Sequence, residues 1–203
     1  MQAYRGARAL DAGFVRRALK AIDQTTLAGA RDYALISVAI VTGRRVSELA
    51  GLRCGDLEPT DSGRVRVTWR RTKGDETYTD LLPPKNSAAL LDYLGQLYGH
   101  GAELQADAAV WASASNHGRG APISSQAIAD ICAKHLKTSK VHRLRHTFAW
   151  TMEQHGAKTS EIQRRLGHKS IATTSLYLQA LIQEENPYAE AIEQAIVGEG
   201  EKA

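Results

Sequence analysis

The sequence predicts a mainly α-helical fold with one small antiparallel β-sheet (α+β). Across most of the 203 residues, apolar side chains recur at the three- and four-residue spacing of a helix. A single pair of segments, 64–69 and 76–82, is instead rich in β-favouring residues on either side of a polar turn, which predicts a hairpin. The 43% hydrophobic content is enough to bury one sizeable core.

The first helices are predicted from their caps and apolar patterns. Asp11 can cap a helix at the start of the domain. Residues 31–42 are apolar almost all round, which predicts a buried central helix ended by Gly43. A shorter helix follows and contains three apolar residues at helical spacing, Val46, Leu49 and Leu52.

Caps and breakers predict five further segments after the hairpin. They are 87–98 after Asn86, 125–137 after Ser124, 142–155 before Gly156, a short helix from a Ser160–Gln163 capping box to Gly167, and 172–185 before Asn186-Pro187. A last amphipathic piece follows that break.

Charge is distributed unevenly along the chain. The net charge is +4, but residues 183–203 contain six acids and one base, leaving 25 of the 26 bases and 16 of the 22 acids in residues 1–182, a net charge of +9. A basic body favours a polyanionic partner. The expected organisation is a lead over 1–10, one domain over 11–181 and an acidic tail over 182–203 that faces solvent or a protein partner.

Several classes of protein are not indicated. No stretch approaches the roughly 20 apolar residues that span a bilayer, and the N-terminus lacks a signal-peptide core, so we expect a soluble, cytoplasmic protein with no membrane partner. Cys54 and Cys132 lack metal-site spacing, which argues against a disulfide scaffold or a zinc module. We expect two core or half-buried thiols, and no metal or cofactor.

Two basic segments could bind phosphate. Arg44 and Arg45 lie at a glycine break just before a helix, where a guanidinium can make paired hydrogen bonds to phosphate oxygens, assisted by amides at the helix start. A pair of surface arginines is the alternative. Lys73, beside Gly74 in the hairpin turn, could deliver an ammonium to a phosphate or a leaving oxygen, or could simply be solvated.

His142, Arg145 and His146 are three and four residues apart and share one face of a helix, while Leu144 points into the core. Two histidines at this spacing could bind a metal, but Arg143 stands where a zinc-protease helix has glutamate, and an arginine opposes cation binding. A base and a guanidinium presented together suit an anionic substrate whose reaction needs proton transfer. The alternative is one core histidine and one surface arginine.

Tyr177 lies nine residues after His168, on a further predicted helix. A tyrosine on an amphipathic helix is most often a packing residue. Its phenol, with a pKa of about 10, becomes a nucleophile only if a base removes the proton or cations stabilise the phenolate. Five residues would supply both functions: Arg45, Lys73, His142, Arg145 and His168.

Taken together and in this order, these segments resemble the tyrosine recombinases of the phage-integrase family. The similar segments are 42–49 with Leu52 and Asp56 as a first arginine box, Thr72-Lys73-Gly74 as the hairpin lysine, 142–149 as a second box, and Leu166-Gly167-His168 followed by 173–177. The resemblance spans 11–180 and implies the catalytic-domain fold of that family. Arg44 departs from the pattern, because the family often has an apolar residue there, and this leaves Arg45 as the better-placed arginine.

The resemblance implies a mechanism. Tyr177 attacks a scissile phosphodiester, forms a 3′-phosphotyrosyl bond and releases a 5′-hydroxyl, and a second 5′-hydroxyl reverses the step without ATP or metal. The implied roles are Arg45 and Arg145 on the non-bridging oxygens, His142 as base, Lys73 as acid for the leaving oxygen, and His168 as hydrogen-bond donor to the phosphate. Glu48 and His146 are hypotheses for a supporting shell that holds the arginines.

The resemblance also implies partners. They are double-stranded DNA and the protein itself, as a tetramer on DNA and a monomer when free, with the 182–203 tail packing on a neighbouring subunit. Residues 1–10 are then the remnant of an interdomain linker, or the lead of a naturally minimal protein. Two alternatives stay open: a type IB topoisomerase that relaxes DNA by the same chemistry, and a DNA-binding protein of this fold that has lost the reaction.

Overall fold

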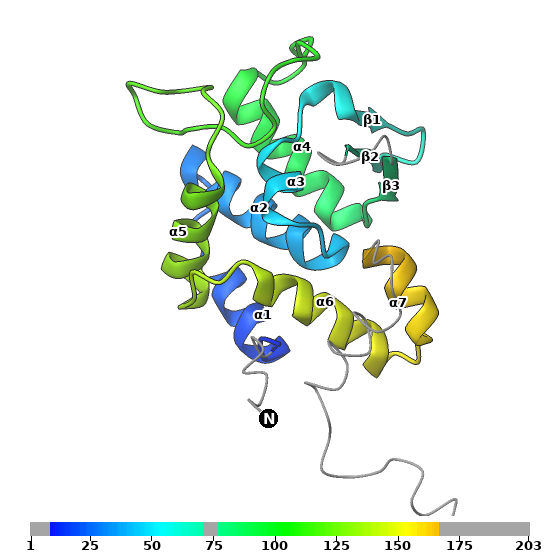
Figure 1. Ribbon diagram of the computed structural model, residues 1–203. Helices are drawn as coiled ribbons and strands as arrows, with labels where there is room; N and C mark the ends of the chain where they lie inside the picture. Colours follow the sequence, from blue (N-terminus) through cyan, green and yellow to red (C-terminus); the bar gives the residue numbers. More distant parts are fainter. Residues whose placement is uncertain (1–8, 71–76, 167–203) are drawn as a thin grey trace, which may run out of the picture.

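The computed structural model describes residues 9–70 and 77–166 (Figure 1). In these residues the elements are α1 (Ala12–Lys20), α2 (Leu27–Thr42), α3 (Val46–Ala50), the short 3-10 helix η1 (Cys54–Asp56), β1 (Leu57–Pro59), β2 (Val65–Arg70), β3 (Thr77–Leu81), α4 (Pro84–Tyr98), α5 (Ser125–Leu136), α6 (His142–Gln154) and α7 (Thr159–Leu166). The predicted fold class, mainly helical with a small antiparallel sheet, is confirmed.

Helix α2 forms the centre of the core, as its apolar sequence predicts. It begins earlier than expected, because the Thr26 side chain accepts a hydrogen bond from Gly29 N at 3.1 Å and caps the first turn. Helices α4 and α6 pack against it (Figure 1). Four of its apolar residues have no exposed surface: Ala34, Leu35, Ile36 and Val38.

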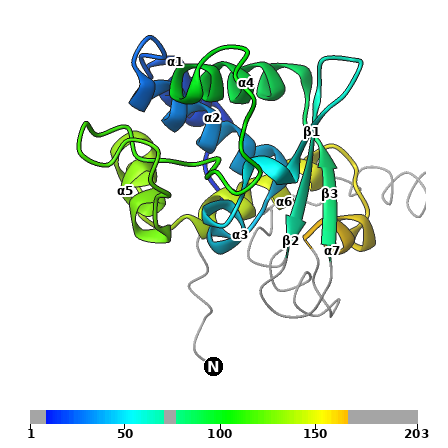
Figure 2. The same ribbon diagram turned by 90° about the horizontal axis from the view of Figure 1, so that it is seen from above.

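The sheet has three antiparallel strands in the order β1-β2-β3. Val67 at its centre pairs with Leu57 on one side and with Asp80 on the other. Strand β1 was not predicted, because its three residues are too few to show an alternating pattern. Figure 2 shows the sheet at one side of the helices, with α7 beside β2 and β3.

Most helix ends lie within two residues of the predicted ones, and three predicted stop or start signals are confirmed. Asp11 Oδ1 accepts from Phe14 N at 2.6 Å, and Ser124 Oγ accepts from Ala127 N at 3.1 Å. Gly43 ends α2 in the left-handed conformation, with φ of 62°.

Two further helix starts differ from the prediction. Helix α4 begins at Pro84 rather than after Asn86, because the fixed φ of proline suits a first turn in which its missing N–H is not needed. At the start of α7, Lys158 N donates to Glu161 Oε2 at 2.8 Å, so the predicted Ser160–Gln163 capping box is wrong. The Glu161 carboxylate closes the first turn from Lys158, two positions before the predicted cap Ser160.

Several predictions lie outside the described residues: Lys73, Gly167, His168, Tyr177, the helix over 172–185, the tail over 182–203 and most of the lead over 1–10. Among the helices that are described, none has the length and apolar character needed to cross a membrane. The thiols of Cys54 and Cys132 are buried, as predicted.

Replacing Gly43 by alanine should weaken the contact between α2 and α6. The new Cβ would lie 2.5 Å from Phe148 Cδ1 of α6, and the residue would keep a positive φ. We expect a loss of about 3 kcal/mol in the free energy of unfolding, from the left-handed backbone and the overpacking together. Urea denaturation followed by circular dichroism measures it.

The matched control is Gly63→Ala, since Gly63 also has a positive φ but its Cβ would meet nothing within 4 Å. That variant should lose only the backbone contribution, about 1 kcal/mol. Equal losses at the two positions would show that the contact with Phe148 is unimportant.

Candidate active site

Arg45 is presented at the turn between α2 and α3 by its contacts with Glu48. Glu48 Oε2 accepts from Arg45 N at 2.8 Å, and Glu48 Oε1 accepts from Arg45 Nη1 at 3.0 Å. The carboxylate therefore caps the helix and holds the guanidinium at once. The Glu48 side chain is 6% exposed and that of Arg45 is 41% exposed, so the arginine remains accessible to an anion.

Arg145 is buried, with 2% of its surface exposed. From α6 it donates through Nη1 to Gly43 O at 2.7 Å and through Nη2 to Leu166 O at 2.5 Å. A surface position for Arg145 is therefore excluded. Among the described residues, these acceptors place it between the end of α2, two residues before Arg45, and Leu166 of α7.

His142 and His146 lie one above the other on α6, as their spacing predicts. Their rings meet edge to face, with centroids 5.0 Å apart and an interplanar angle of 88°. His142 is exposed and His146 is buried. The His146 ring therefore packs against the His142 ring and supports it. The hypothesis that His146 holds an arginine stays a prediction.

The surroundings of both rings favour the neutral imidazole. Partial burial, followed by the charges of Arg145 and Arg45, lowers the pKa of His142 below its ordinary value. Burial, followed by the neighbouring His142, Arg145 and Arg143, lowers the pKa of His146 to about 4. Both rings are therefore neutral at neutral pH, and the exposed His142 is the one placed to accept a proton from a substrate. The hydrogen bond from Arg145 to Gly43 O brings the two basic segments together.

Arg44 has a different role from Arg45. It is 5% exposed and donates to Asp80 Oδ2 through Nε at 2.9 Å and Nη2 at 2.7 Å. Its guanidinium also lies over the rings of Trp69 and Tyr78, at 5.7 and 5.2 Å from the centroids. The interpretation of Arg44 and Arg45 as a surface pair is therefore wrong for Arg44, and Arg45 is the one available to a ligand.

Sequence analysis missed Asp80, which also accepts from Trp69 Nε1 at 2.9 Å and from Arg165 Nη1 at 3.3 Å. One signal was present. Asp80 follows Tyr78 by two residues, so it points to the same face of the strand as an aromatic side chain that packs on the core. A carboxylate on a buried face of a strand needs hydrogen-bond donors or a positive charge beside it. The basic residues next to Gly43 and Leu166 in the sequence could supply them.

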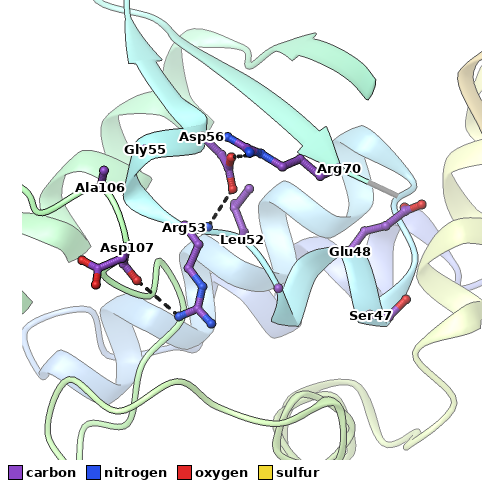
Figure 3. A pocket seen from close by; sticks show the side chains of 10 residues that line it. Ser47, Glu48, Leu52, Arg53, Gly55, Asp56, Arg70, Ala106 and Asp107 are labelled. Carbon is purple, nitrogen blue, oxygen red and sulfur yellow. Dashed lines mark hydrogen bonds and ion pairs between the residues drawn. The ribbon is translucent and has the colours of Figure 1, made fainter. Parts of the chain in front are cut away.

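A pocket of about 520 Å³ is lined in part by Glu48, the residue that holds Arg45 (Figure 3). Asp56 Oδ1 accepts from Arg70 Nε at 2.8 Å, and Asp56 Oδ2 accepts from Arg53 N at 3.0 Å. Asp56 therefore joins the turn after α3 to the end of β2, the strand that leads to Lys73. The polar residues of the pocket wall include acids, bases and one serine: Ser47, Glu48, Arg53, Asp56, Arg70 and Asp107.

The structure thus brings together five of the eight predicted site residues, namely Arg45, Glu48, His142, Arg145 and His146. Lys73, His168 and Tyr177 lie outside the described residues. An exposed arginine, a buried arginine and two neutral histidines at one turn define a site suited to an anionic group whose reaction moves a proton.

The sequence matches the phage integrase family over residues 8–184, and the chain belongs to this family. The putative integrase/recombinase y4rC of Sinorhizobium fredii is 32% identical over 167 residues, which are 81% of this chain and 49% of that protein. The tyrosine recombinase XerC of Herpetosiphon aurantiacus is 35% identical over 156 residues, 73% of this chain and 48% of that protein. The chain spans about half the length of these relatives.

Solved structures share the fold. The XerA recombinase aligns with a TM-score of 0.68 at 26% identity, over 92% of this chain and 64% of that one. The catalytic domain of bacteriophage HP1 integrase aligns with a TM-score of 0.58 at 17% identity, over 98% of this chain and 99% of its own. The predicted tyrosine-recombinase catalytic-domain fold is confirmed.

The lowered pKa of His146 predicts a pH-dependent stability. The folded value of about 4 lies below the ordinary 6.5, so the unfolded chain binds more protons between these values and stability falls as the pH drops through that window. Between pH 7 and pH 5 this group should remove about 2 kcal/mol of unfolding free energy. Urea denaturation at both pH values measures the change.

The control is His146→Gln, which cannot titrate in this window. Its unfolding free energy should depend on pH less steeply than that of the parent, by about the same 2 kcal/mol. An identical pH dependence in the two proteins would mean that burial does not keep the His146 ring neutral.

Proposed function

We propose that the chain is the catalytic domain of a site-specific DNA recombinase that cuts and rejoins DNA through a 3′-phosphotyrosyl intermediate at Tyr177. The observation that supports this most is the convergence of Arg45, Arg145 and His142 at the turn after α2. Membership of the phage integrase family supports it independently. The net charge of +9 over residues 1–182 suits duplex DNA as the substrate.

In the proposed first step, the phenolate oxygen of Tyr177 forms a bond to the scissile phosphorus and the bond from phosphorus to the 5′-oxygen breaks. The phenol proton passes to His142, and the ammonium of Lys73 gives a proton to the departing 5′-oxygen. In the second step, a 5′-hydroxyl attacks the phosphotyrosine and both proton transfers reverse. One ester bond replaces another each time, so no ATP is consumed.

The arginines supply the electrostatic part of the proposal. Charge accumulates on the non-bridging oxygens in the transition state, and donors already aimed at them need no reorganisation. Glu48 holds Arg45 from the helix side, and two carbonyls hold Arg145. His168 is the further proposed donor. A tyrosine with a pKa of about 10 needs such cations nearby to ionise.

The proposed partners follow from this chemistry. Strand exchange joins two duplexes, and we propose four copies of the chain on DNA, with a single copy when free. The acidic segment over 182–203 would contact a neighbouring copy, and residues 1–10 would lead into the domain over 11–181. Because the relatives are about twice as long, other parts of a longer protein would add DNA contacts.

Covalent capture tests the nucleophile. The protein is incubated in EDTA with a pool of nicked duplexes, in which loss of a short 5′-hydroxyl fragment prevents rejoining, and then denatured. We expect an adduct of protein and DNA that forms without metal and is absent for Tyr177→Phe. Sequencing of the captured DNA gives the preferred site.

The matched control is Tyr33→Phe, which removes the same hydroxyl from a half-buried tyrosine of α2 and should leave the adduct intact. Salt-sensitive DNA binding without any adduct would favour a non-catalytic DNA-binding protein. Relaxation of a supercoiled plasmid without exchange between two site-bearing duplexes would favour the topoisomerase function.

A further inference from the structure

The carboxylate of Asp80 connects three elements that surround the candidate site. Its Oδ2 accepts from Arg44, just after α2, and from Trp69 of β2. Its Oδ1 accepts from Arg165 near the end of α7 at 3.3 Å. Asp80 is 9% exposed and Arg44 and Trp69 are buried, so these two contacts are made largely out of water, where charge-assisted hydrogen bonds are strongest; the contact with Arg165 is more open to solvent.

Two of these partners are chain neighbours of the groups that hold Arg145. Arg44 follows Gly43, whose carbonyl accepts from Arg145 Nη1, and Arg165 precedes Leu166, whose carbonyl accepts from Arg145 Nη2. The contacts close a ring that runs from Arg145 to the end of α2, through Asp80, to the end of α7 and back to Arg145. One carboxylate thereby links the two carbonyls that accept from the Arg145 guanidinium within the described residues.

The ring matters because the apolar packing of α7, among the residues that the structure describes, is a small cluster. Ala149 of α6 packs with Ile162 and Leu166 of α7, apart from the main core. The strands β2 and β3, in contrast, belong to the main core through Trp69 and Val67. The pair between Arg165 and Asp80 is therefore a direct polar link between α7 and the sheet.

A guanidinium is a rigid planar fork, so the two carbonyls must stand at a fixed separation to accept from both terminal nitrogens. We propose that Asp80 is a positioning residue for Arg145, because its ion pairs with Arg44 and Arg165 set the separation of the Gly43 and Leu166 carbonyls. The consequence for DNA cleavage rests on the proposed function. The effect on the Arg145 guanidinium does not.

The test begins with Arg165→Met. The Arg165 side chain is 56% exposed, so this variant opens the ring with little effect on folding. Asp80→Asn removes the negative charge that both arginines pair with and replaces one of the two acceptor oxygens by a donor. The control is Glu58→Gln, which removes an ion pair of 2.6 Å between exposed side chains on the same sheet, with Arg66, and has no link to Arg145.

Nitrogen-15 NMR of the free protein reads the guanidinium of Arg145 directly, through the exchange of its Nη protons with water. We expect exchange to accelerate about fivefold in Arg165→Met, the factor that corresponds to one hydrogen bond, and further in Asp80→Asn. Glu58→Gln should leave it unchanged. Arg165→Lys, which keeps a cation opposite Asp80, should restore slow exchange in part.

The proposal is overturned if Arg165→Met folds and the Arg145 protons exchange as in the parent, whether or not Asp80→Asn folds. Single-turnover cleavage at saturating DNA gives the functional arm, in which Arg165→Met should be slower by roughly tenfold. If exchange accelerates but neither this variant nor Arg145→Ala slows cleavage, the positioning stands and the catalytic role proposed for Arg145 is wrong.

Discussion

The buried guanidinium of Arg145 constrains the arrangement of the helices around it. An arginine cannot lose its charge in a protein, so one that is 2% exposed requires acceptors close by. Two backbone carbonyls, of Gly43 and Leu166, meet this requirement. They tie the end of α2 and Leu166 of α7 to α6, which carries Arg145. The left-handed Gly43 is part of the same solution, because a side chain there would collide with Phe148 of α6.

The site can hold several positive charges close together because Arg44, Arg45 and Arg145 each bind a carboxylate or backbone carbonyls. Glu48 holds Arg45, Asp80 holds Arg44, and carbonyl dipoles hold Arg145. The histidines contribute by remaining neutral, since burial and nearby cations disfavour their charged forms. The result is one exposed cation beside a neutral imidazole, an arrangement suited to a phosphate and a proton acceptor.

Local features of the fold could be predicted, because they depend on residues close in sequence. The caps at Asp11 and Ser124 and the left-handed stop at Gly43 follow from side-chain or backbone geometry within one turn. The shared face of the residues from His142 to His146 follows from helical periodicity. Errors arose where two local signals competed, as at Asn86 against Pro84.

The sequence by itself determined the order of the helices and of the β2–β3 hairpin, the family and the five basic and acidic candidates that meet near the turn after α2. Only the tertiary structure decided which of two adjacent arginines is buried, because that depends on Asp80, 36 residues away. It also decided that Arg145 is enclosed and not on the surface, since its acceptors are 102 and 21 residues distant. The physical reason is that periodicity reports which face of an element a residue occupies, whereas burial and charge pairing depend on the elements that cover that face.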